Sequence, residues 1–465
     1  MAFVFITSTG PDVAEREVDR RRIRRHAMRG VAMARRARGD YGQHNRRQLP
    51  LFLGPTTQKE NTPPPHVDPV HMVPPSLPAQ GYELAKLTYR FDILSLSALA
   101  SVHLSRSSAR TLAPCPASMQ KLAEMRQPSW LDFVPARYSE SRLLQAAVDC
   151  TLARAHRSLH PHSDISETTA IRLYLKALSE LQEALDDKLE GRWASPDVLC
   201  ATKILTFYEF LQCSQSQWLH HITGTQKLMR LRGPDNYSTD LEQQILMSQT
   251  GTIFHESMSI GEDCFLEEPK WKTLLSSIAA VESLSCHPVV SSLWIYVSPT
   301  ARLFRQTGVC INGAGDPGTI LHLILEAYQT RQNLLTWREN FTRFAAEQPD
   351  RHAPRLREFL GVSFAVQIML NRLIVALEPR AEDARTFENE AQTFADRVIV
   401  LCDEADKEAL PASCMLLAEK IVIAKATKWT RDDWMAVSGT DSTCRRMPAA
   451  VFEKWSISLR RRDVD

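Results

Sequence analysis

A glycine-rich stretch is the first candidate for chemistry. Residues 313–318 read G-x-G-x-x-G and precede an expected helix, as do loops that hold the pyrophosphate of a dinucleotide. Such a loop also needs a preceding strand and a surrounding β-α-β unit. Only three apolar residues, 309–311, come before this one. We therefore interpret Asp316 as a helix N-cap and Pro317 as the first helical residue.

Two clusters contain potential metal ligands. The acidic run at residues 186–190, D-D-K-L-E, resembles the cluster with which all-α terpene cyclases bind magnesium and a diphosphate. We find no matching Asn, Ser/Thr and Glu cluster in the C-terminal half, which favours a solvated helix end. His156, His160 and His162 could share a metal, but Pro161 separates the third, so a surface cluster is favoured. Because no H-E-x-x-H, G-x-S-x-G or Walker motif occurs, we predict no catalysis, no cofactor and no bound metal.

An arginine-rich arm opens the chain. The formal net charge of +2 combines +7 for residues 1–47, which hold twelve arginines, no lysine and five acidic residues, with −5 for the remainder. Within the arm, Ile23, Ala27, Val31 and Ala34 recur at helical spacing, which indicates a helix with a thin apolar stripe. The arginines of residues 20–38 are Arg20, Arg21, Arg22, Arg24, Arg25, Arg29, Arg35, Arg36 and Arg38.

These arginines predict a nuclear-import signal, and contact with nucleic-acid phosphates is compatible with it. Such contacts would depend strongly on salt and would carry no sequence choice. No aromatic residue interleaves with the arginines, so the arm offers no stacking platform for single strands.

The elements that must position any site in the body are helices. Residues 50–78 contain nine prolines and no helical period, which predicts an extended or disordered linker over residues 48–81. Beyond it, apolar residues recur at spacings of three and four, and no stretch of six or more alternates with period two. The sequence therefore predicts a basic arm (1–47), a Pro-rich linker (48–81) and an all-α domain of ten or more helices (82–465).

Local signals mark several helices. A capping box is expected at residues 164–167, followed by an apolar face. The expected face comprises Ile171, Tyr174, Leu178, Leu181 and Leu185. Ser195 and Pro196 predict the next helix start, and Gly233-Pro234 predicts the end of a helix from residue 216 to 232. Later helices are marked by Leu321, Ile324, Leu325 and Tyr328 and by Phe387, Ala391, Phe394, Val398 and Leu401.

Cysteine usage and hydropathy bear on the compartment. The ten cysteines are scattered and no C-x-x-C occurs, which indicates free thiols in a reducing compartment. The most apolar stretch, residues 359–377, is interrupted by Gln367, Asn371 and Arg372. Because these side chains would be costly in hydrocarbon, we predict a buried helix and no membrane span.

Two stretches resemble a known family. Residues 3–5, Gly10-Pro11 and residues 23–29 are similar to the opening of many fungal transcription-factor-like proteins. Residues 218–233 resemble the W-x-x-H-x-x-G-x-x-x-L-x-x-x-R-G helix of the fungal-specific regulatory domain that follows zinc binuclear cluster domains. The matching residues are Trp218, His221, Gly224, Leu228, Arg232 and Gly233. Leu181, Gln182, Ala184, Leu185, Tyr208 and Glu209 also match that domain.

The resemblance implies a nuclear transcription regulator, of a metabolic or secondary-metabolite pathway, with an all-α regulatory domain. DNA-binding members carry six cysteines in their zinc cluster, whereas this chain has no cysteine before Cys115. The expected partners are therefore other transcription proteins or a DNA-reading partner, in a homo- or heterodimer, with non-specific DNA contact through the arm. The alternatives are a magnesium/diphosphate enzyme of terpene-cyclase type and a helical interaction scaffold.

The motif helix also has a physical interpretation. Trp218, His221, Thr225, Leu228 and Arg232 recur on one helical face. A glycine inside a helix costs about 1 kcal/mol relative to alanine, so the glycine of this motif predicts a close approach by a neighbouring helix. The histidine is expected to be a buried hydrogen-bonding residue and not a metal ligand.

Overall fold

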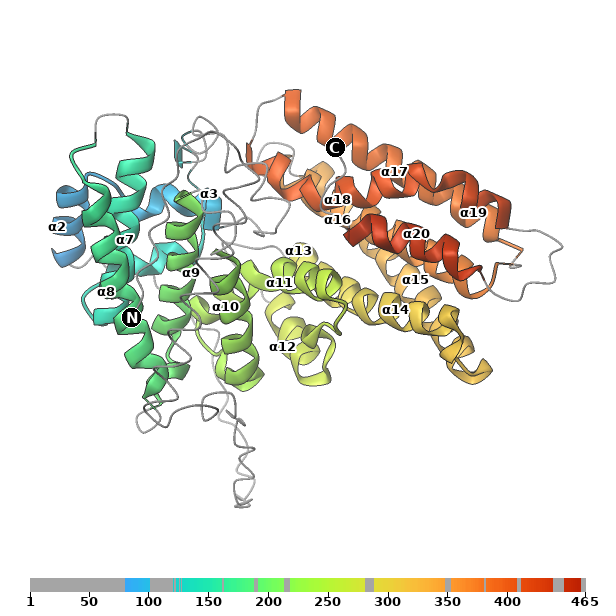
Figure 1. Cartoon of the computed structure of the whole chain (residues 1–465), viewed down its shortest axis with the longest axis horizontal. Helices are drawn as coiled ribbons and strands as arrows, with labels where there is room; N and C mark the ends of the chain where they lie inside the picture. The colour runs from blue at the N-terminus through green and yellow to red at the C-terminus, as the bar shows by residue number, and fades with distance from the viewer. Residues whose placement is uncertain are drawn as a thin grey trace, which may run out of the picture. The chain divides into compact units, whose positions relative to one another are not determined.

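The protein is described by a computed structural model, in which every regular element of the described residues is helical (Figure 1). The described residues are 80–100, 120, 123–124, 126, 128–160, 163–187, 191–212, 218–280, 288–347, 353–379, 382–407, 411–437 and 447–460. The chain divides between residues 72 and 73, and all of these residues belong to the second part. The all-α prediction is confirmed for them. The predicted arm, and the predicted linker up to residue 79, lie outside them.

The helices fall into two successive groups along the chain. The first comprises α2 (Gln80–Tyr89), α3 (Ser97–Ala100), α6 (Val134–Arg137), α7 (Arg142–Leu159), α8 (Glu167–Asp186), α9 (Pro196–Leu211), α10 (Trp218–Arg232), α11 (Asp240–Ile260) and α12 (Pro269–Ala279). The second comprises α13 (Pro288–Val297), α14 (Pro299–Val309), α15 (Pro317–Glu347), α16 (Ala353–Leu377), α17 (Ala384–Lys407), α18 (Pro411–Trp429), α19 (Arg431–Val437) and α20 (Ala449–Arg460).

Helix α9 is the centre of a first hydrophobic core, where it packs against α7, α8 and α10 (Figure 1). Its predicted start is confirmed: Pro196 is the first helical residue, and the Ser195 hydroxyl accepts the backbone N–H of Asp197 at 3.2 Å. Every residue from Asp197 to Leu211 is buried. The polar side chains of α9 are therefore enclosed together with its apolar ones, which makes them the candidates for specific interior contacts.

Helix α8 forms where predicted, but its cap and its face differ. The N-cap is Ser166, whose hydroxyl accepts the backbone N–H of Thr169 at 3.1 Å, so the capping box predicted to begin at Asp164 is wrong. Ile171 and Leu185 of the expected face are exposed. The buried residues of α8 are Ala170, Ala177, Leu181 and Ala184. Alanines let the backbones of α8 and α7 approach closely, which rotates the buried face away from the largest side chains.

A second hydrophobic core surrounds α16. The stretch Arg357–Leu377 of α16 is long and apolar enough to cross a membrane, and 89% of its most apolar 18-residue window is buried inside the structure. In the C-terminal part of this helix Arg372 is fully enclosed, with Nη2 and Nε at 2.6 and 3.0 Å from the carboxylate of Glu388. The guanidinium also lies 4.4 Å from the ring centroid of Trp434. These contacts satisfy a charge that the sequence places inside an apolar helix.

Helix α17 and the cysteines agree with expectation. The predicted face of α17 is buried at Phe387, Ala391, Phe394 and Val398. Four cysteines are buried as free thiols, Cys150, Cys200, Cys264 and Cys310, and Cys402 is a half-buried free thiol.

Helix α11 belongs to both cores. Its residue Ile253 lies in the first core and the next residue, Phe254, lies in the second. Met247 and Met258 of the same helix pack against both. The motif helix α10 immediately precedes α11. The contacts between these two helices therefore link the first core to α11, the helix shared by both cores.

Candidate functional site

Helix α10 carries the motif residues and ends where predicted. It runs from Trp218 to Arg232, and Gly233 follows with a φ of 73°, a conformation that glycine adopts at little cost. Thr225 is fully buried. Leu228 is partly buried against the first core. The side chain of Trp218 lies outside the described residues, so its place on the expected face stays a prediction.

The histidine of the motif joins a polar network between α8, α9 and α10. His221 Nε2 lies 3.0 Å from the hydroxyl of Tyr174 in α8. The Tyr174 ring is stacked on that of Tyr208 in α9, with centroids 4.2 Å apart and planes 1° from parallel. Burial lowers the pKa of His221, and the charge of nearby Glu209 opposes that shift. The neutral imidazole is therefore favoured as the hydrogen-bonding partner of Tyr174.

The network continues from Tyr208 into a half-buried ion pair between α7 and α8. Arg154 of α7 donates to the Tyr208 hydroxyl at 3.1 Å and to both oxygens of Glu167 at 2.6 and 3.0 Å. Arg157 donates to the same carboxylate at 2.7 Å. Because Glu167 is the first residue of α8, its contacts fix the start of that helix against α7. The fork of a guanidinium suits such a two-oxygen contact.

The arginine at the end of the motif pairs with α11. Arg232 Nη2 donates to Glu242 Oε1 at 2.6 Å, and both side chains are buried. The other oxygen of Glu242 accepts the backbone N–H of Thr239 at 3.0 Å, completing a capping box at the start of α11. Burial alone would raise the pKa of Glu242, but the hydrogen bonds from Arg232 and Thr239 lower it overall. The carboxylate is therefore held in its charged form between two helix ends.

The glycine of the motif does not mark a close helix approach. A Cβ built on Gly224 would meet no atom of the described residues within 4 Å. The close contact that we expected from the cost of a helical glycine is therefore wrong for these residues, and nothing in the structure explains the preference for glycine here.

The two candidate metal clusters are engaged in local contacts. Asp186 accepts the side-chain amide of Gln182 at 2.7 Å, and Asp187 forms an ion pair with Arg192. The rings of His156 and His160 stack with centroids 4.6 Å apart. Among the described residues, no group of three His, Cys, Asp or Glu side chains is placed to hold a metal. Residues 162 and 188–190 lie outside that set.

The glycine-rich stretch is a helix-to-helix connection. It follows α14 through a π-helical turn, Cys310–Ala314, instead of a strand. Asp316 Oδ1 accepts the backbone N–H of Thr319 at 3.0 Å, and α15 begins at Pro317, which confirms the predicted cap. Of the predicted face, Ile324 is buried and Tyr328 packs partly buried against the second core, whereas Leu321 and Leu325 are exposed and Leu323 is buried instead. The dinucleotide geometry is absent from this segment.

Several buried charges were missed by the sequence reasoning, among them two cations of the first core. Arg154 lies in an alanine-rich run of α7, and Lys203 lies in the fully buried helix α9. Their signal was the interruption of an apolar run by a single cation, the same signal that identified Arg372 in α16. The arm arginines of residues 20–38 lie outside the described residues, so their role stays a prediction.

Comparison with known proteins agrees with the motif. The model of the fungal specific transcription factor domain matches residues 96–418, well over half of the chain. The chain is also 30% identical over 167 residues to an uncharacterized protein of Emericella nidulans, an alignment that covers 35% of each protein. The chain therefore matches about a third of that relative's length. No solved structure gives a significant match.

The matched region contains the motif helix α10, the network around His221 and the ion pair of Arg232 with Glu242. The resemblance read from residues 218–233 and the family match coincide. The chain belongs to the fungal specific transcription factor domain family.

Proposed function

We propose that this protein is a nuclear regulator of transcription whose helical domain acts in regulation and whose arginine arm directs nuclear import. The observation that carries the proposal is the family match over residues 96–418, on a domain that is helical throughout its described residues. The buried ion pair of Arg232 with Glu242 supports a role of the motif helix in holding that domain together.

DNA selection is proposed to come from a partner. A zinc cluster needs closely spaced cysteines, and the first cysteine of this chain is Cys115. Contacts between arginines and phosphates carry no sequence information, so phosphate contacts by the arm would add affinity to a complex whose sequence choice lies in the partner. We propose that the genes controlled belong to a metabolic or secondary-metabolite pathway.

Nuclear import is tested with a fluorescent fusion of the full chain. The test variant combines Arg20→Ala, Arg21→Ala, Arg22→Ala, Arg24→Ala and Arg25→Ala. The fusion should move from the nucleus to the cytoplasm, because the densest part of the positive charge is removed. A control carries Arg16→Ala, Arg46→Ala and Arg47→Ala, in the same arm but outside residues 20–38, and should stay nuclear. Unchanged nuclear accumulation of the test variant would show that the arm is not the import signal.

A further inference from the structure

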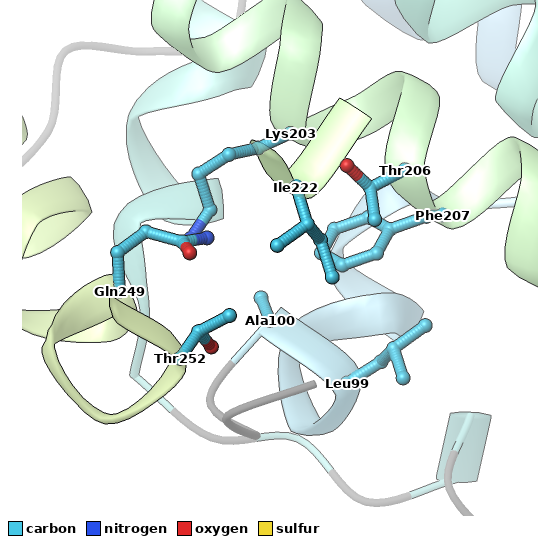
Figure 2. A pocket seen from close by; sticks show the side chains of 8 residues that line it. All are labelled: Leu99, Ala100, Lys203, Thr206, Phe207, Ile222, Gln249 and Thr252. Carbon is cyan, nitrogen blue, oxygen red and sulfur yellow. The ribbon is translucent and has the colours of Figure 1, made fainter. Parts of the chain in front are cut away.

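A small polar pocket lies inside the first core, beside the motif helix (Figure 2). Its volume is about 10 Å³, close to the roughly 10–15 Å³ that one water molecule needs. It is lined by Leu99, Ala100, Lys203, Thr206, Phe207, Ile222, Gln249 and Thr252. These residues come from α3, α9, α10 and α11. A metabolite does not fit in this volume, but a single water molecule or a monatomic ion does.

Lys203 brings an ammonium group to this pocket without a carboxylate partner. The side chain is 4% exposed, and Nζ donates to Ser248 Oγ at 2.6 Å. Nζ also lies 5.0 Å from the ring centroid of Trp130, a cation–π contact. Among the described residues, no carboxylate forms an ion pair with Lys203. An ammonium has three N–H donors, so two remain after the bond to Ser248.

Gln249 supplies a second unmatched group. Its side chain is 8% exposed, and its buried Oε1 has no hydrogen-bond partner among the residues that the structure describes. The ends of Lys203 and Gln249 are directed toward the same region in Figure 2. The amide oxygen and nitrogen have nearly the same shape, so a half-turn of the amide would point two N–H donors where the oxygen lies. The pocket would then present donors from both residues to one acceptor.

We propose that this pocket binds one monatomic monovalent anion of the chloride class, as the counter-ion of the Lys203 ammonium. A buried charge is costly unless an opposite charge or several hydrogen bonds compensate it. A water molecule would accept a hydrogen bond from Lys203 but would leave its charge uncompensated. The small volume of the pocket favours a monatomic halide ion over the larger phosphate and carboxylate groups.

The titration of Lys203 sets the pH range in which anion binding stabilises the folded protein. Burial lowers its pKa to about 7, whereas the unfolded chain keeps a value of about 10.4. Between these two pH values Lys203 is protonated in the unfolded chain but neutral in the folded one, so the free energy of unfolding rises with pH across this window. The stability lost by charging the buried lysine is fully lost below about pH 7. An anion that binds only the ammonium offsets that loss. Its effect should therefore be larger at pH 6 than at pH 9.

Other titratable groups on the surrounding elements are engaged elsewhere. Asp132 accepts the backbone N–H of Ser129, His221 contacts Tyr174, and Glu242 pairs with Arg232. Asp197 of α9 pairs with Arg137, His255 of α11 pairs with Glu419, and burial raises the pKa of the Cys200 thiol on α9. Helix α3, Ser97–Ala100, carries no titratable residue. Lys203 is therefore the group through which chloride and pH would act at this pocket.

The test compares thermal unfolding of the full chain in sodium chloride, sodium bromide and sodium gluconate at equal ionic strength. At pH 6 the Tm should be higher in both halides than in gluconate by about 2 °C or more. At pH 9 that difference should shrink. A Tm at pH 6 that is the same in all three salts would overturn the proposal and leave the pocket with a water molecule.

Two variants locate the effect. Gln249→Glu places a carboxylate of the same shape in the pocket, so it should raise the Tm in gluconate at pH 6 and remove the difference between salts. Lys203→Met should also remove that difference. The control Lys227→Met deletes an exposed lysine of α10 and should keep it. Halide dependence that persists in Gln249→Glu would place the anion elsewhere and overturn the assignment. This result can be read even if the Lys203→Met variant does not fold.

Discussion

At the scale of single residues, the motif acts through buried contacts and not through exposed chemistry. Arg232 closes the motif helix by pairing with Glu242, and the same carboxylate caps α11. His221 reaches Tyr174 of α8 at the other end of the helix. The polar residues of the pattern thus join α10 to its neighbours. Their spacing predicted one helical face, but the partners come from other elements and could not be predicted from that spacing.

The contribution of the Arg232–Glu242 ion pair to the free energy of unfolding is tested by comparison with Arg230 on the same helix. Removing one member of a buried ion pair costs about 3–5 kcal/mol, and Arg232→Met should lower the free energy of unfolding by that order. Arg230 forms an exposed pair with Glu268 at 3.0 Å, so Arg230→Met should cost about 1 kcal/mol or less. Urea unfolding of both variants measures the difference. Equal losses would contradict a structural role for the motif arginine.

At the scale of elements, ends were easier to predict than faces. The start of α9 at Pro196 and the end of α10 before Gly233 follow from local backbone chemistry, and the structure has both. The buried face of α8 depends on how closely α7 approaches, which no local signal contains. Alanine is only weakly hydrophobic, so the periodicity argument passed over Ala170, Ala177 and Ala184. It did identify Leu181, which is buried, and Tyr174 and Leu178, which are partly buried, but it wrongly added Ile171 and Leu185 at the ends of the face.

The rotated face of α8 makes a direct prediction. Ala177 is fully buried, whereas Leu175, two residues earlier, is 59% exposed. Ala177→Leu should destabilise the protein by about 1–3 kcal/mol, because added side-chain volume in a packed interface forces neighbours apart. Leu175→Ala should change stability by about 0.5 kcal/mol or less. Thermal or urea unfolding separates the two, and a larger loss in Leu175→Ala than in Ala177→Leu would contradict the burial of the alanine face of α8.

At the scale of the whole molecule, the all-α class and the family could be predicted, and both are confirmed. The class follows from helical periodicity without alternation, and the family follows from the order of the motif residues. The division into two cores joined by α11 could not be predicted, because Ile253 and Phe254 are adjacent apolar residues that periodicity does not assign to different cores.

The central claim is that the chain acts on chromatin as a transcription regulator, and chromatin occupancy of the tagged full-length protein tests it most directly. The account predicts enrichment at a limited set of promoters, and loss of that enrichment when Arg20, Arg21, Arg22, Arg24 and Arg25 are changed to alanine. An untagged strain and the control carrying Arg16→Ala, Arg46→Ala and Arg47→Ala define the background and the expected wild-type level. A protein that is present in the nucleus and shows no enrichment above the untagged strain would contradict the account.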